Sequence, residues 1–404
     1  MMMPQIKSLW QNRDFLVVWG GQSISMFGTR VSYIAWIWWV LERTDSPAAV
    51  AGIGIAAALP SLLLGPIAGA IVDRLDRRKV MTAMDLINAV VFGSAAFLMF
   101  VDVLQVWHVY LFTAVSATAM AFHRPSLQSS IPNLVSEEQL TRANSLYQIS
   151  RGICGIVGLL LGGILVGLIG VAPTLWLDAA TFLLAGLSLL LVAFPSPRTE
   201  KVEGWKTILQ DTVGGFRFLL NRRSLFYLVL LFALVNFLLA PVGVLFSIMS
   251  KDVFNAGSQG LGALNAAISV GVLTGGFLSA SLKRLRKHGL GILLGLLATG
   301  VLITLFGVSM NLYVSLGILA GLGIFVAVVN VFESVIFQTR VPNELQGRVF
   351  AAQFAVCDGL QPLSLAAIGA LLTVISAPTV LVGSGIAIVL ASLAGLAVKG
   401  LTEL

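Results

Sequence analysis

The chain has 404 residues, of which 57% are hydrophobic and only 11% charged, and its mean hydropathy is +0.95. A water-soluble domain of this composition could not cover its surface with polar groups, so the composition excludes an ordinary soluble protein and indicates that the lipid bilayer is its solvent. The formal net charge of +7 would fit a nucleic-acid-binding protein only if the basic residues formed a patch on a soluble surface.

Apolar segments long enough to cross a bilayer recur along the whole chain. A helix of about 20 apolar residues spans about 30 Å of hydrocarbon. We expect twelve transmembrane helices, at 15–41, 48–72, 80–101, 107–130, 146–169, 174–194, 224–249, 260–282, 289–308, 312–337, 350–375 and 379–398. The sequence therefore predicts an all-α membrane protein.

The positions of the basic residues predict the topology. If the N-terminus is cytoplasmic, the 25 Lys and Arg residues all fall in inner segments, apart from Arg43 and Lys251 in outer loops and Arg30 and Arg151 within helices. This positive-inside distribution predicts a multi-pass membrane protein with both termini cytoplasmic. We expect membrane lipids, and no nucleic acid, among its partners.

A charged loop joins the second and third predicted helices. It contains Gly69, Asp73, Arg74, Arg77 and Arg78 in the pattern G-x-x-x-D-R-x-x-R-R. A glycine lets two helices approach closely, a carboxylate is favoured at a helix N-terminus, and arginines are attracted to the anionic inner leaflet. The pattern is therefore suited to a contact at the cytoplasmic ends of helices.

The two halves of the chain are repeats of one another. Asp73-Arg74-Leu75 matches Lys283-Arg284-Leu285 at an offset of 210 positions (283 − 73), and Gly52, Gly65 and Pro132-Asn133 have matches at the same offset. Repeats of this kind predict two pseudo-symmetric six-helix bundles. We expect an N-terminal bundle at 1–194, a cytoplasmic linker at 195–223 and a C-terminal bundle at 224–404.

These features together resemble the major facilitator superfamily. More narrowly, the chain resembles its bacterial macrolide-efflux and enterobactin-exporter group. This narrower resemblance rests on Leu59-Pro60 to Gly65-Pro66, Arg124-Pro125, Ile131 to Val135, Arg142-Ala143-Asn144 and Gly347-Arg348-Val349. The resemblance implies the major facilitator fold, in which parallel repeats hold a substrate near mid-membrane.

The resemblance also implies a location, the bacterial cytoplasmic (plasma) membrane, and a function. It implies a secondary active transporter that works by alternating access, an exporter of amphipathic small molecules of the drug or siderophore type, with H+ as the coupling ion. We expect a monomer, no enzyme activity, no cofactor and no metal. The chain has no G-x-x-x-x-G-K-[ST] segment, which argues against ATP as the energy source. The alternatives are an importer or a lipid or metabolite transporter of the same fold, or a non-transporting membrane sensor.

By resemblance, the charged loop is part of a cytoplasmic gate. Asp73 would dock at the start of the eleventh predicted helix, near Gly347 and Arg348, when the cytoplasmic side is closed. The predicted gate comprises Gly69, Asp73, Arg74, Arg77, Arg78, Gly347 and Arg348. The alternative is that the basic residues only set the topology.

The first predicted helix carries candidate substrate-binding residues. Arg30 lies near its middle, and an ionisable side chain at that depth is a default candidate for a functional site. We expect Gln22, Arg30, Tyr33 and Trp36 to line a cavity in which Arg30 attracts an anionic or strongly polarised group. Alternatively, Arg30 is structural and pairs with an acid on a neighbouring helix.

The fifth predicted helix is rich in glycine. Gly158, Gly162 and Gly163 resemble a degenerate form of the G-P-x-x-G-G signature of antiporters, with leucine in place of proline. The alternative is ordinary close helix packing. We expect the helix at 260–282 to be the packing partner.

Later helices contribute further polar candidates. Asn236 and Asn265 lie at a plausible depth for substrate binding. Glu333 and Asp358 are candidates for proton coupling, because a charged carboxyl in a membrane is costly and can alternate between protonated and charged forms. Asp178 is expected to cap or pair structurally, and Asp85 to lie about one turn inside the cytoplasmic boundary.

Overall fold

The computed structural model describes residues 9–72, 75–192, 214, 216–281, 287–398 and 400–402, and the regular secondary structure in these ranges is helical. The first half contains α1 (Arg13–Thr44), α2 (Pro47–Val72), α3 (Arg77–Phe100), α4 (Val106–Leu134), α5 (Glu137–Ile153), α6 (Leu159–Ile169) and α7 (Val171–Leu189). The second half contains α9 (Arg223–Leu239), α10 (Val242–Ile248), α11 (Gly257–Ser281), α12 (His288–Val308), α13 (Leu312–Arg340), α14 (Asn343–Cys357), α15 (Gln361–Leu371) and α16 (Ala377–Ala397).

Each predicted membrane segment coincides with helix, but three are interrupted. A π-helical turn, Cys154–Gly158, lies between α5 and α6. Pro241, which has no N–H to continue a helix, lies between α9 and α10, and a second π-helical turn, Met249–Val253, follows α10. Gly359 lies in the break between α14 and α15.

The described residues contain ten helical segments long and apolar enough to cross a membrane. The long helices α1 and α4 are not among the ten, and both carry many polar residues. The chain is thus an all-helical membrane protein, while the count of twelve spans remains a prediction.

The chain forms two compact units. Unit 1 comprises residues 1–36 and 56–203, and unit 2 comprises residues 37–55 and 204–404. The segment 37–55, which contains the end of α1 and the start of α2, therefore packs with unit 2. The predicted linker 195–223 lies mostly outside the described residues, so the predicted domain boundaries remain predictions.

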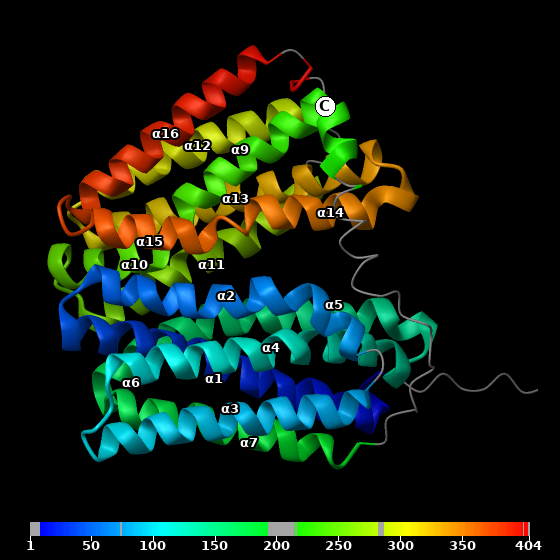
Figure 1. Cartoon of the computed structure of the whole chain (residues 1–404), viewed down its shortest axis with the longest axis vertical. Coiled ribbons are helices and arrows are strands. Elements are labelled where there is room, and N and C mark those ends of the chain that lie inside the picture. Colours follow the sequence, from blue (N-terminus) through cyan, green and yellow to red (C-terminus); the bar gives the residue numbers. More distant parts are fainter. Residues whose placement is uncertain are drawn as a thin grey trace, which may run out of the picture. The chain divides into compact units, whose positions relative to one another are not determined.

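In unit 1, α3 lies beside α4 and α7 (Figure 1). Aromatic rings join these helices to α1. The ring centroids of Trp36 and Phe92 are 6.2 Å apart, and Phe92 stacks on Phe182 at 5.6 Å. Asp178 of α7 is completely buried, and its carboxylate accepts hydrogen bonds from Ser32 of α1 and from Thr181. Asp178 therefore has the structural pairing role that the sequence indicates.

The glycines around the π-helical turn pack against α1. A Cβ atom at Gly158 would lie 2.7 Å from Cβ of Arg30, and one at Gly162 would lie 2.9 Å from Cα of Val31. Only glycine permits such close backbone approach. The expected partner at 260–282 was wrong, because the surface that these two glycines face is α1.

The glycines of α11 instead face α13 within unit 2. A Cβ at Gly275 would lie 2.7 Å from Cα of Ile324, and one at Gly271 would lie 2.9 Å from Cα of Gly323. The helices α12 and α16 also lie side by side (Figure 1). Close glycine contacts thus hold each unit together through its own helix pairs.

Candidate substrate cavity

Unit 1 contains a cavity of about 210 Å³. The helices α1, α3, α4, α5 and α7 and the π-helical turn form its wall. Its lining residues are Gln22, Ser25, Met26, Thr29, Arg30, Asp85, Met120, His123, Arg124, Gln128, Tyr147, Arg151, Cys154 and Phe182. Polar side chains from several helices therefore gather at this cavity, and its three arginines are exposed.

Three arginines from three helices line this cavity. They are Arg30 of α1, Arg124 of α4 and Arg151 of α5. The positive charges of Arg124 and Arg151 act on Arg30. None of the three forms an ion pair with a carboxylate of the described residues. The cavity is therefore strongly electropositive, and the alternative of an Arg30 paired with a neighbouring acid finds no support in this geometry.

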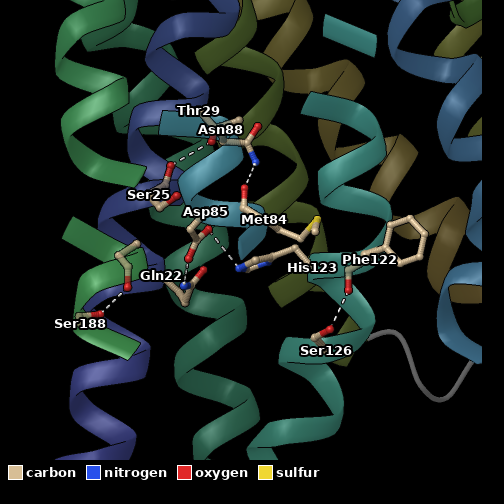
Figure 2. Close-up of polar contacts among 11 residues, drawn as sticks. Gln22, Ser25, Thr29, Met84, Asp85, Asn88, Phe122, His123, Ser126 and Ser188 are labelled. Carbon is tan, nitrogen blue, oxygen red and sulfur yellow. Dashed lines mark hydrogen bonds and ion pairs between the residues drawn. The ribbon is translucent and has the colours of Figure 1, made fainter. Parts of the chain in front are cut away.

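A polar cluster of three helices lies in the same wall (Figure 2). Asp85 of α3 is completely buried, and its Oδ2 accepts a hydrogen bond of 3.0 Å from Nε2 of Gln22 on α1. Its Oδ1 lies 3.2 Å from Nε2 of His123 on α4. Asp85 is the ninth residue of α3, and its depth in the membrane stays a prediction.

The predicted substrate-binding residues are not all brought together. Gln22 and Arg30 line the cavity, whereas Tyr33 and Trp36 are not among its lining residues. Trp36 is buried against Phe92. In unit 2, the side chain of Asn265 donates to the carbonyl of Leu261 within its own helix, and Asn236 is exposed.

The predicted proton-coupling acids lie in unit 2. Glu333 of α13 accepts a hydrogen bond of 2.5 Å from Nε2 of Gln353 on α14. Asp358 follows the last residue of α14, at the break before α15. The two carboxyl groups are close enough to interact electrostatically. Among the described residues, no Lys, Arg or His forms an ion pair with either carboxyl group.

The predicted gate is described only in part. Asp73 and Arg74 lie outside the described residues, while Gly69 lies in α2 and Gly347 in α14. Within unit 1, Arg77 donates to the carbonyl of Ser129 at 2.8 Å, and Arg78 donates to the carbonyl of Leu190 at 2.5 Å. Arg78 thus caps the C-terminal end of α7.

The gate's remaining member, Arg348, is exposed on α14. Arg77 and Arg78 have a packing role that the sequence did not indicate, because their partners lie on distant helices. A gating role for these residues stays a prediction.

Sequence reasoning missed most of the cavity. Arg124 counts among the basic residues of the inner segments, and Arg151 stands out only as a basic residue within a helix. The available signal was the presence of two arginines, Arg30 and Arg151, within predicted spans. Two cations within predicted spans that lack acids nearby in the sequence indicate a shared site.

The comparisons with known proteins identify the family. A family model described as "Transmembrane secretion effector" matches residues 8–402, so the chain belongs to this family of major facilitator transporters, as the sequence predicts. It is a multi-pass integral membrane transporter.

Its relatives include efflux proteins. Macrolide efflux protein A of Streptococcus pyogenes is 26% identical over 87% of each chain. The multidrug efflux pump Tap of Mycolicibacterium fortuitum is 26% identical over 85% of each chain. Enterobactin exporter EntS of Shigella boydii is 29% identical over 61% of this chain and 59% of its own.

Solved structures support the fold. A bacterial homologue of the iron transporter ferroportin superposes with a TM-score of 0.76 at 17% identity, over 96% of this chain and 99% of its own. At this identity the likeness concerns the fold alone.

Proposed function

We propose that this protein is a secondary active exporter of amphipathic small molecules that carry a negative group, and that it works by alternating access. The observation that carries the proposal is the cavity of unit 1, with three arginines in its wall. The names of the relatives, which include macrolide, multidrug and enterobactin exporters, support export as the direction.

The positive charge of the cavity favours some of the substrates named for the relatives over others. Arginines without acid partners are costly within a membrane protein, and an anion in the cavity would offset that cost. Guanidinium groups also form short, strong hydrogen bonds to acidic oxygens. The cavity therefore favours an anionic compound, such as a catecholate siderophore, over a macrolide with a basic amine.

The size of the cavity limits what it holds. Its volume of about 210 Å³ is smaller than the roughly 300–1,000 Å³ of sites that enclose a drug-sized ligand. We infer that it receives the charged group, while the apolar remainder of the substrate contacts other surfaces.

Alternating access requires a contact that forms and breaks in each cycle. The segment 37–55 is the best described candidate, because it belongs to the first repeat in the sequence but packs with unit 2. Nζ of Lys251 lies 2.6 Å from Oδ1 of Asp45, and a Cβ at Gly54 would lie 2.8 Å from Cδ1 of Leu365. We propose that this contact closes the outer side.

We further propose that Glu333 and Asp358 couple transport to protons. When two carboxyl groups lie close together and form no ion pair with a cation, their negative charges repel one another, and this repulsion favours the binding of a proton by one of them. The hydrogen bond from Gln353 holds Glu333 in place and leaves a carboxyl oxygen free for a proton.

Transport by the purified protein in liposomes tests the proposed function. A pH gradient and a membrane potential are imposed separately, and macrolides, catecholate siderophores and lipophilic cations are compared. We expect catecholate transport in the export direction, stimulated by the pH gradient. Transport of lipophilic cations alone would contradict the anionic substrate, and transport only in the opposite direction would identify an importer.

A further inference from the structure

We propose that Asp85 and His123 form a proton-binding site in the wall of the arginine cavity, and that proton uptake there strengthens the binding of an anionic group. This inference rests on the proposed function, because it concerns the affinity of the same cavity. It adds a second titratable site, distinct from Glu333 and Asp358 of unit 2.

The two side chains of the pair are buried at the edge of the cavity. Asp85 is completely buried and His123 is 3% exposed, yet both belong to the cavity lining. Oδ1 of Asp85 and Nε2 of His123 lie 3.2 Å apart. No aligned hydrogen bond joins these two atoms, and neither has another hydrogen-bond partner among the described residues. A buried acid and base at this distance are suited to share an added proton.

Several charged side chains surround Asp85 and His123. The titratable and charged groups that line the cavity around Asp85 are Arg30 from α1, His123 and Arg124 from α4, Tyr147 and Arg151 from α5, and Cys154 from the π-helical turn. The helix α7 carries one acid, Asp178. Asp178 is occupied by Ser32 and Thr181 and does not line the cavity. Asp85 is therefore the one acid among the described residues that line this cavity.

One added proton changes the net charge of the Asp85 and His123 pair. When His123 is neutral, the negative charge of Asp85 opposes an incoming anion. When His123 is an imidazolium, the pair is neutral overall and the arginines act without that opposition. One unit of charge across a small, partly desolvated cavity changes the affinity for a monoanion by about tenfold or more.

The sign of this linkage has a consequence for transport. A proton at Asp85 and His123 helps the anion to bind, and by reciprocity the anion helps the proton to bind. This site alone therefore favours movement of proton and anion together. Exchange of protons for the anion then depends on other groups, such as Glu333 and Asp358, or on the membrane potential.

Equilibrium binding to the full-length protein in lipid nanodiscs tests the inference. Taurocholate is a suitable probe, because its sulfonate keeps a fixed negative charge between pH 5.5 and 8. For the wild type we expect the Kd to fall by about tenfold from pH 8 to pH 5.5. Tetraphenylphosphonium, a fixed cation, should show no such tightening.

Two substitutions should shift the affinity in opposite directions. His123→Gln retains the charge of Asp85, so its Kd should stay at the weak alkaline value at every pH. Asp85→Asn removes that charge, so its Kd should stay near the tight acidic value. If Asp85→Asn does not fold, His123→Lys, a permanent cation, should give the same tight binding. The matched control is His108→Gln, on the same helix but outside the cavity, which should bind as the wild type does.

The outcomes separate the two proposals. Taurocholate binding that is independent of pH, or variants that shift together in one direction, would overturn the proton site and leave the anionic substrate standing. No taurocholate binding at any pH, with tetraphenylphosphonium still bound, would overturn both.

Discussion

The two repeats place different chemistry at equivalent positions. His123 of α4 and Glu333 of α13 are related by the same offset of 210 positions (333 − 123) that relates the other repeat pairs. Around His123, unit 1 gathers arginines and a single acid. Around Glu333, unit 2 gathers a second acid and an amide. Under the proposed function, the first repeat binds the anionic group of the substrate, and the carboxyl pair of the second repeat binds the coupling proton.

The largest effect is expected from a substitution that removes an arginine from the cavity of unit 1. Arg30→Gln removes a charged donor from the cavity, so the affinity for taurocholate should fall by about 10- to 100-fold, while that for tetraphenylphosphonium should change little. Binding in nanodiscs measures both. Arg43→Gln, in the last turn of the same helix and outside the cavity, is the matched control. If Arg30→Gln folds poorly and its folded fraction binds normally, Arg30 is structural.

The next largest effect is expected from a substitution in the carboxyl pair of unit 2, which should alter transport but not anion binding. Glu333→Gln cannot lose or gain a proton, so transport driven by a pH gradient should fall by about tenfold, whereas taurocholate binding should be retained. Transport and binding are measured on the same liposome preparation. Asp358→Asn should act in the same direction. A variant with full transport that still responds to the pH gradient would exclude Glu333 from coupling.

Stability provides a third test, because α1 and its glycine contacts position Arg30. Gly162→Ala would place a Cβ 2.9 Å from Cα of Val31, so it should destabilise the protein by about 1–3 kcal/mol. Gly20→Ala is the control, because a Cβ there meets nothing within 4 Å. Thermal unfolding in detergent compares the two. Equal stability of both variants would mean that α1 and α6 are not closely packed.

The smallest effect is expected at the ion pair of Lys251 and Asp45. The side chain of Asp45 is 81% exposed, and exposed ion pairs contribute only about 0.2–1 kcal/mol. Asp45→Asn should therefore change the transport rate by less than about fivefold, and high salt should remove the difference. A complete loss of transport would show that the contact does more than stabilise one side.

Much of the fold could be predicted from the sequence. Apolar length predicted the positions of the helices, and the Gly69 to Arg78 loop predicted the superfamily. The interruptions were harder to foresee, because the π-helical turn Cys154–Gly158 has no residue type of its own. The packing partner of Gly158 was also wrong, since a glycine pattern shows that a helix is approached closely but not by which helix.

The site was only partly predictable, because a sequence does not give the rotation of one helix against another. Arg30, Tyr33 and Trp36 are spaced by about one turn, yet only Arg30 lines the cavity. Asp85 and His123 are 38 positions apart (123 − 85), and their contact depends on how α3 and α4 pack. Arg124 resembled a topology signal because it stands near a predicted boundary.

A cryo-electron microscopy map of the full-length protein with bound taurocholate tests the central claim most directly. The account predicts density for the sulfonate in the cavity of unit 1, with its oxygens about 2.7–2.9 Å from guanidinium nitrogens of Arg30, Arg124 or Arg151. Density for the sulfonate elsewhere, with the three arginines free of ligand, would contradict it.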